Sequence, residues 1–145
     1  MKAPVTYWGG KQQLKDKILS LISEHERYNE PFFGGGAIFF AKQPAPIEFI
    51  NDINGEVVNF YRTLKRNFDE LKTEVECTLH SEFQHNQARE IYNNPLSHSN
   101  VLRAWTVWML SHQSIYSILD RGWSVSINKN KAKQTKSSCT ESAGF

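Results

Sequence analysis

The chain has 145 residues, 39% of them hydrophobic and 22% charged, with a formal net charge of +2. This length suits one domain with one sizeable core, and the composition argues against wholesale disorder. No apolar run approaches the roughly 20 residues of a membrane span, and the amino terminus lacks the apolar core of a signal peptide. We therefore expect a cytoplasmic protein without a membrane partner.

The first predicted elements are a helix and a strand. The apolar residues of the segment 11–25 recur at helical spacing and predict an amphipathic helix. These residues are Leu14, Ile18, Leu21 and Ile22. The next segment, "RYNEPFF", is extended in character because Pro31 disfavours helical dihedrals in the residue before it. It predicts a strand that leads into three consecutive glycines.

A second helix and a second strand are predicted after the glycines. The apolar segment "AIFFAK" predicts a helix buried against the first strand and ended by Pro44 and Pro46. The segment "IEFIND" is short, rich in strand formers and bounded by turn residues, so it predicts a second strand. Residues 56–67 return to helical spacing and predict a further helix.

This order of elements predicts an α/β fold with a parallel sheet covered by helices, and a βαβ unit over residues 28–52. A doubly wound sheet has about five or more strands, and two are convincing here. We therefore expect an incomplete sheet followed by a mainly helical region.

Beyond residue 68 three segments have helical character. They are "FDELKTEVECTLH", "EFQHNQAREIY" and "NVLRAWTVWMLSHQSIYSIL". In the third, Trp105, Trp108 and Met109 are expected on a core-facing surface. The segment "WSVSI" is the next candidate strand.

The tail from residue 128 is polar and basic. Four lysines fall close together without an acid among them: Lys129, Lys131, Lys133 and Lys136. Such a run is either a solvated loop or a phosphate-contacting segment, and the sequence leaves both open.

The cysteines and histidines do not predict a metal site. Cys77 and Cys139 are far apart and give no disulfide framework, which fits a reducing compartment. Cys77, His80 and His85 lack a C-x-x-C pair, so a polar helix face explains them better than a metal site does.

The three glycines follow the first predicted strand, where a missing side chain lets a ligand approach the backbone. Asp52 closes the second strand 16 residues after Gly36, near the offset of about 20 residues at which an acidic side chain binds a ribose. Phe39 takes the place of the third glycine of G-x-G-x-x-G, which disfavours NAD and FAD. A nucleoside without a pyrophosphate and a simple tight turn both stay open.

A family resemblance is carried by three motifs in this order: "TYWGGK", "NEPFFGGGAIFF" and "INDINGEVVNFYRTLK". The chain resembles the Dam-type, or D12 class, adenine-specific DNA methyltransferases in their alpha arrangement. The resemblance is strong over residues 5–67 and looser over residues 100–128. It implies a partial Rossmann-like, S-adenosylmethionine-dependent methyltransferase fold with a helical insert.

The resemblance also implies three regions. Residues 1–67 would form the part that binds S-adenosylmethionine. Residues 68–128 would be mainly helical and would start the DNA target-recognition region. Residues 129–145 would be a basic polar tail.

A set of cofactor contacts is implied as well: Tyr7, Lys11, Phe33, Gly34, Gly35, Gly36 and Asp52. The tyrosine would contact S-adenosylmethionine, the lysine would bind its carboxylate end, and Asp52 would hold the ribose. Phe33 and the glycines would form the wall and floor under the methionine and sugar. From the residues alone, Lys11 could instead be a solvated residue that starts a helix, and Asp52 could cap the next helix.

The family transfers a methyl group from S-adenosylmethionine to N6 of an adenine in double-stranded DNA, after flipping the base out of the stack. Its catalytic motif is an Asp-Pro-Pro-Tyr run, and the five prolines of this chain are never adjacent. We therefore expect a truncated chain that holds the cofactor half of the site and no catalytic residue. A missing carboxyl-terminal half or a complementing polypeptide would complete it, in a DNA methylation role such as restriction-modification.

A second hypothesis is a non-catalytic DNA-binding module. Arg121, Trp123, Lys129 and Lys131 combine basic phosphate contacts with an aromatic stacking platform. Trp123 could equally pack in a core or a hairpin. Salt-dependent DNA binding without cofactor binding would favour this hypothesis.

A third hypothesis, another nucleotide-dependent enzyme, is weakened by Phe39 and by the lack of a further catalytic constellation. His112 and Ser114 lie two positions apart in a predicted helix. Residues at that spacing face different sides of a helix, so direct pairing for nucleophilic catalysis is disfavoured.

Overall fold

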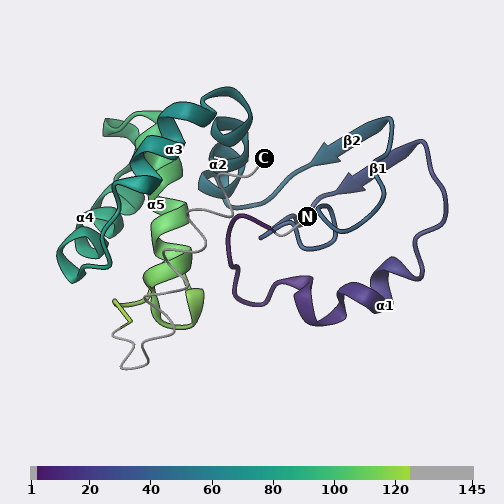
Figure 1. Cartoon of the computed structure of the whole chain (residues 1–145), viewed down its shortest axis with the longest axis horizontal. Coiled ribbons are helices and arrows are strands. Elements are labelled where there is room, and N and C mark those ends of the chain that lie inside the picture. Colours follow the sequence, from purple (N-terminus) through teal and green to yellow (C-terminus); the bar gives the residue numbers. More distant parts are fainter. Residues whose placement is uncertain (1–2, 125–145) are drawn as a thin grey trace.

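The computed structural model describes residues 3–124 (Figure 1). In this part of the chain the strands β1 and β2 lie together with α1, and the helices α2–α5 lie together on the other side of the molecule. We call residues 3–54 the strand part and residues 55–124 the helical part.

The strand part holds a parallel pair of strands. β1 (Arg27–Glu30) pairs with β2 (Ile47–Ile50), so that Arg27 lies beside Ile47 and Glu30 beside Ile50. The predicted parallel sheet is therefore confirmed within residues 3–124. Because the strands are parallel, their carboxyl ends meet at one edge, which we call the carboxyl edge.

The connection between the strands differs from the predicted βαβ unit, because residues 36–42 form turns rather than a helix. Gly36 has a φ of +70°, in the left-handed region that does not begin a right-handed helix. Helix-like hydrogen bonds are confined to about one turn, from Phe40 N to Gly36 O and from Lys42 N to Ile38 O. The prediction of a helix over "AIFFAK" is wrong, and the Rossmann-like arrangement stays a prediction.

The amino-terminal helix is shorter than predicted. The 3-10 helix η1 (Lys11–Leu14) and the helix α1 (Lys15–Leu19) end at residue 19 rather than 25. Neither element buries a side chain, and Leu21 is 78% exposed. The Ser20 hydroxyl donates to the carbonyl of Lys17 at 2.8 Å and competes with further helix. An apolar stripe without a surface to cover does not extend a helix.

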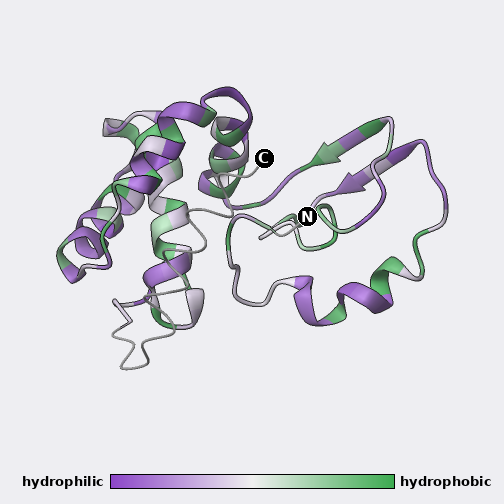
Figure 2. Cartoon of the chain, viewed as in Figure 1, coloured by the Kyte–Doolittle hydropathy of each residue, from purple (hydrophilic) through white to green (hydrophobic). Residues whose placement is uncertain are grey.

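The helical part contains α2 (Gly55–Arg66), α3 (Phe68–Glu76), α4 (Glu82–Asn93) and α5 (Asn100–Gln113). The 3-10 helix η2 (Pro95–Ser97) precedes α5. Side chains cap two of these helices: Asn54 accepts from Glu56 N at 3.0 Å, and Ser99 accepts from Leu102 N at 3.2 Å. Figure 2 shows hydrophobic and hydrophilic residues interspersed along the helices, as amphipathic packing requires.

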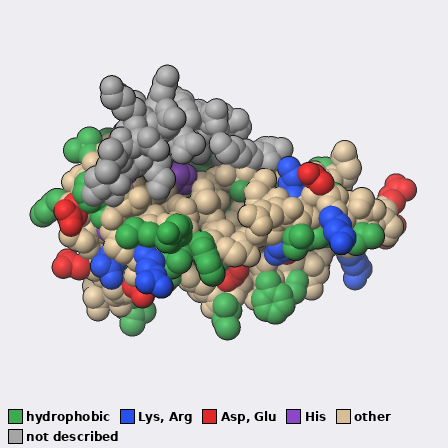
Figure 3. Space-filling model, turned by 90° about the horizontal axis from the view of Figure 1, so that it is seen from below, with side chains coloured by type: hydrophobic (Ala, Val, Ile, Leu, Met, Phe, Trp, Pro, Cys, Tyr) green, Lys and Arg blue, Asp and Glu red, His purple; other side chains and the backbone are tan. Residues whose placement is uncertain are grey.

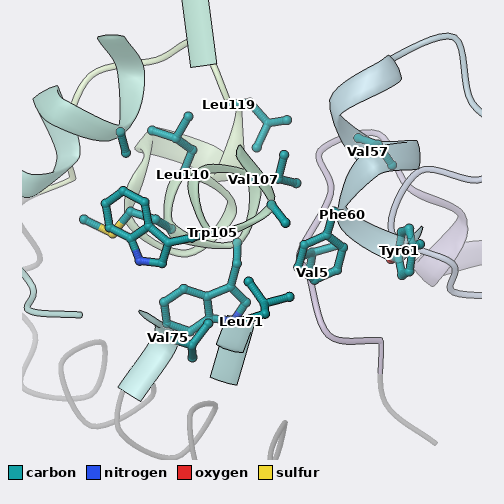
Figure 4. Close-up of a cluster of buried hydrophobic side chains, with 14 of the residues drawn as sticks. Val5, Val57, Phe60, Tyr61, Leu71, Val75, Trp105, Val107, Leu110 and Leu119 are labelled. Atoms are coloured by element: carbon teal, nitrogen blue, oxygen red, sulfur yellow. The ribbon is translucent and has the colours of Figure 1, made fainter. Parts of the chain in front are cut away.

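Helix α5 is the centre of the core, with α2, α3 and α4 packed against it. Trp105, Trp108 and Met109 are 4%, 1% and 0% exposed, so the prediction that they face the core is confirmed. Figure 4 shows side chains from several elements gathered around this helix. Val5 and Phe33 from the strand part belong to the same buried cluster, which joins the two parts.

Two predicted helices end earlier than their sequence patterns suggest. α3 ends at Glu76 with Cys77 as its cap, rather than running to residue 80. α5 ends at Gln113, because the chain becomes extended at Ser114 and then takes left-handed dihedrals in η3 (Ile115–Ser117). Trp123 pairs with Ser114 in an isolated antiparallel bridge, and residues 125–127 of the candidate strand "WSVSI" lie outside the described residues.

Candidate functional site

The carboxyl edge brings the glycine segment and Asp52 together. Gly34 N donates to Asp52 Oδ2 at 2.7 Å, and Asn54 N donates to Asp52 Oδ1 at 2.9 Å. The Asp52 side chain is half-buried. A carboxylate has about four lone-pair positions, so two are left for a ligand. A partly exposed carboxylate with spare acceptor positions fits the paired hydroxyls of a ribose.

The glycines themselves are required by the turn. Gly34 and Gly36 have φ values of +54° and +70°, which side chains rarely adopt. A Cβ on Gly34 would lie 3.3 Å from Tyr7 Cδ1, and one on Gly36 would lie 2.8 Å from ring atoms of Phe33 and Phe40. The absence of side chains is thus explained by close aromatic neighbours within the protein. The case for a ligand rests on the groups around the turn.

Tyr7 is one of these groups, because its ring lies against Gly34 and its Cβ lies beside Gly35. Burial is the main cause that raises the pKa of the Tyr7 hydroxyl, and the charge of Asp52 adds to it. A hydrogen bond with the Asn54 side chain acts in the opposite direction. The two predicted cofactor contacts Tyr7 and Asp52 therefore lie close to one another at the carboxyl edge.

Lys11 is tied to the end of β1. Its Nζ lies 2.9 Å from Glu30 Oε1 and also donates to the carbonyl of Phe32. Glu30 is 5% exposed and accepts from the Tyr28 hydroxyl at 2.9 Å. Lys11 is therefore more than a solvated residue at a helix start. It balances a buried carboxylate, and one of its three N–H groups is left for another acceptor.

The two phenylalanines before the glycines have different environments. Phe33 is 3% exposed, and its ring centroid lies 4.6 Å from that of Tyr61 in an edge contact. Phe32 is 75% exposed beside the Lys11 contact. Phe33 thus supports the turn from the core, and Phe32 is the one with an accessible ring. Two adjacent phenylalanines give no sequence signal for which of them faces the core.

Asn54 and Tyr92 are contacts at this edge that sequence reasoning missed. Asn54 Nδ2 donates to the Tyr92 hydroxyl at 2.8 Å, which joins α4 to the turn after β2. Burial is the main cause that raises the pKa of Tyr92, and the Asn54 hydrogen bond acts in the opposite direction. The pair is 38 positions apart, and no motif links residues at such a distance.

The predicted DNA contacts lie in the segment after α5. Arg121 is exposed, whereas Trp123 is half-buried and its ring centroid lies 5.5 Å from that of His80. Together with the bridge to Ser114, this contact supports hairpin packing for Trp123 rather than a free stacking platform. Lys129 and Lys131 lie outside the described residues.

His85 and His112 of the helical part make contacts within the protein. His85 is 0% exposed and Ser114 2%, and His85 Nε2 lies 2.9 Å from Ser114 Oγ, out of reach of a substrate. His112 Nδ1 instead lies 2.7 Å from the carbonyl of Trp108. Within residues 3–124, no group of three or more His, Cys, Asp or Glu side chains could hold a metal ion.

A cavity of about 920 Å³ lies elsewhere, between the loop after α1 and the segment before β2. Leu19, Ile22, His25, Pro44 and Pro46 are among its lining residues. None of the predicted cofactor contacts lines it, so it is separate from the carboxyl edge.

A comparison with known families agrees with the resemblance that the motifs carry. The model of the D12 class N6 adenine-specific DNA methyltransferases matches residues 7–134. The chain belongs to this family. The match covers the strand part from residue 7 onward and the helical part, including the segment that holds Arg121 and Trp123.

Curated relatives of this D12 chain are longer proteins. It is 46% identical over 70 residues to the Type II methyltransferase M1.LlaDCHI of Lactococcus lactis subsp. cremoris, an alignment that covers 47% of this chain and 24% of that protein. It is 38% identical over 65 residues to the DNA N-6-adenine-methyltransferase of Escherichia phage P1, covering 45% of this chain and 8% of that protein. The chain thus spans a quarter or less of these relatives.

No helix in residues 3–124 has the length and apolar character to cross a membrane.

Proposed function

We propose that this D12 chain supplies the S-adenosylmethionine-binding part of an adenine-specific DNA methyltransferase. The enzyme transfers a methyl group to N6 of an adenine in double-stranded DNA. The contact between Gly34 N and Asp52 Oδ2 supports this most, because it fixes a half-buried carboxylate beside a turn without side chains. Family membership supports the choice of reaction.

In this proposal each group at the carboxyl edge has a separate task. The free lone pairs of Asp52 accept the two ribose hydroxyls, and the ring of Tyr7 lines the site beside Gly34. The remaining N–H of Lys11 donates to the carboxylate end of the cofactor. Phe33 supports the glycine turn from the core side, while Phe32 has an exposed ring next to this turn. When bound, S-adenosylmethionine supplies a methyl group already activated on a sulfonium.

The DNA substrate meets the protein beyond α5 in this proposal. Arg121, Lys129 and Lys131 contact phosphates, and Trp123 positions the segment through its packing on His80. Residues 1–67 form the cofactor-binding region of a Rossmann-like fold, residues 68–128 begin target recognition, and residues 129–145 form the basic tail. The enzyme acts on cytoplasmic DNA, in restriction-modification or a related methylation role.

The catalytic Asp-Pro-Pro-Tyr run comes from another polypeptide segment in this proposal. An exposed apolar strand supports this view: Ile47, Phe49 and Ile50 of β2 are 41%, 59% and 39% exposed. On the face that Figure 3 shows, seen from below, further hydrophobic side chains lie at the surface. Such an apolar strand suits coverage by further strands of the complete fold.

Titration calorimetry of S-adenosylmethionine into the chain tests the cofactor role. We expect binding by the unchanged chain and at least a tenfold loss of affinity in Asp52→Ala, because hydrogen bonds to a charged group contribute about 1.5–3 kcal/mol each. Asp16→Ala is the matched control, since that side chain is 94% exposed on α1.

Unchanged affinity in a folded Asp52→Ala variant would refute the ribose contact. Failure of the unchanged chain to bind would refute the assignment of the cofactor part to this chain. Salt-dependent DNA binding in that second case would favour the non-catalytic module.

A further inference from the structure

Helix α4 reaches the carboxyl edge through the hydrogen bond between Tyr92 and Asn54. Tyr92 lies in the last turn of α4, and its hydroxyl accepts from Asn54 Nδ2 at 2.8 Å. Asn54 lies two residues after Asp52 and donates its backbone N–H to Asp52 Oδ1 at 2.9 Å. A path of two hydrogen bonds therefore runs from the helical part to the carboxylate of the candidate site.

Each polar group of the Asn54 side chain has a partner. Its Oδ1 accepts from Glu56 N at 3.0 Å and caps α2, while its Nδ2 donates to Tyr92. The oxygen faces a hydrogen-bond donor and the amide nitrogen faces an acceptor, so the side chain has one favoured orientation. Loss of the Tyr92 hydroxyl would leave the cap in place and remove the contact to α4, while the hydrogen bond between the Asn54 side chain and Tyr7 would remain.

Asp52 depends on this arrangement because both of its oxygens are held by backbone N–H groups in loops. Gly34 N at 2.7 Å comes from the turn after β1, and Asn54 N at 2.9 Å comes from the turn after β2. The β2 turn is tied to the packed helices through Tyr92, since α4 packs against the central helix α5.

We propose that Tyr92 is a positioning residue for the cofactor site, which orients Asn54 and through it fixes the Asp52 carboxylate against Gly34. This inference rests on the proposed cofactor role of Asp52. It gives the helical part a direct influence on the cofactor site, in addition to its place in target recognition.

The test compares Tyr92→Phe with Tyr116→Phe. Both variants lose only a hydroxyl, and Tyr116 is 76% exposed in η3. We expect the amides of Gly34 and Asn54 to exchange with solvent about three- to tenfold faster in Tyr92→Phe, the size expected for loss of one hydrogen bond. Any acceleration at the α5 amides should be smaller than at Gly34 and Asn54, and all amides should stay unchanged in Tyr116→Phe.

Affinity for S-adenosylmethionine provides the second readout. Tyr92→Phe should weaken binding about three- to tenfold. Asn54→Ser keeps an oxygen that can cap α2 and removes the amide donor. In the Asn54→Ser background, Tyr92→Phe should therefore have no further effect.

Three outcomes separate the inference from the proposed function. Unchanged exchange at Gly34 and Asn54 in Tyr92→Phe would overturn the inference, and so would additive effects of Tyr92→Phe and Asn54→Ser on affinity. Faster exchange in a chain whose unchanged form does not bind S-adenosylmethionine would overturn the proposed function and leave the coupling of Tyr92 to Asp52 standing.

Discussion

The strand part and the helical part use their hydrophobic residues in opposite ways. In α5 every residue from 104 to 111 is buried. In β2 all four residues are exposed, and α1 buries none. The helical part therefore carries the core of the molecule. The strand part, where the candidate site lies, depends on a few attachments to that core.

These attachments are of two kinds. Val5 and Phe33 enter the common hydrophobic cluster, and Phe33 meets Tyr61 of α2 in an edge contact. The hydrogen bond from Asn54 to Tyr92 is a polar attachment. Within the strand part, ion pairs hold the segments together, such as Lys42 with Glu48. The candidate site therefore lies on the strand part, and contacts with the more deeply buried helical part hold it in place.

The largest expected effect is on the free energy of unfolding, and it distinguishes a tryptophan of the helical part from one of the strand part. Trp108 is 1% exposed in α5, and Trp8 is 64% exposed in the strand part. Trp108→Ala should lower the free energy of unfolding by about 3–5 kcal/mol through lost burial and a cavity. Trp8→Ala should change it by less than about 0.5 kcal/mol. Urea denaturation followed by circular dichroism measures both, and equal losses would remove the contrast between the parts.

A smaller effect tests the glycine turn of the strand part. Gly36→Ala introduces a Cβ at a φ of +70° and 2.8 Å from ring atoms of Phe33 and Phe40. The free energy of unfolding should fall by about 1–3 kcal/mol because of backbone strain and displaced rings. Gly122→Ala is the control, since its Cβ would meet nothing within 4 Å. A neutral Gly36→Ala would mean that the strand part can rearrange without affecting the core.

The sequence predicted the helical part better than the strand part, and this contrast has a physical cause. The helix α2 has strong apolar periodicity, and Pro95 marks the end of α4 in the sequence. In "AIFFAK" the apolar residues do not decide between a helix and packed turns. The positive φ of Gly36 and the contact of Phe33 with Phe40 decide it, and both depend on the tertiary structure.

The candidate site was predictable where a motif contained its residues. The structure brings Tyr7, Gly34 and Asp52 together, and it places Lys11 near them on Glu30. The exposure of Phe32 rather than Phe33 depends on which ring the core accepts. The contact with Tyr92 depends on how α4 packs, which local patterns do not encode.

A pH dependence should distinguish the helical part further. Burial, together with the nearby positive Arg89, lowers the pKa of His85, with smaller effects of either sign from Glu82 and His80. The unfolded state then binds more protons than the folded state below about pH 6.5. Stability is therefore fully present above that pH and falls as the pH decreases toward the folded-state pKa of His85.

Unfolding in urea at about pH 7.5 and about pH 5.5 measures this dependence across the window below the unfolded-state pKa. His85→Gln should flatten the dependence, whereas His98→Gln, at a half-buried position before α5, should retain it. An unchanged dependence in His85→Gln would assign the titration to another group.

The smallest expected effect concerns the exposed strand. Phe49 is 59% exposed in β2, so Phe49→Ser should change the free energy of unfolding of this chain by less than about 0.5 kcal/mol. Phe33→Ser, at a position that is 3% exposed, should by contrast cost about 3 kcal/mol or more. A large loss in Phe49→Ser would show that the strand part has a core of its own.

If Phe49 instead packs against the segment that carries the catalytic motif, the same variant should weaken complementation by that segment in a methylation assay. A side chain that is neutral for folding and costly for complementation would locate the surface on which the enzyme is completed.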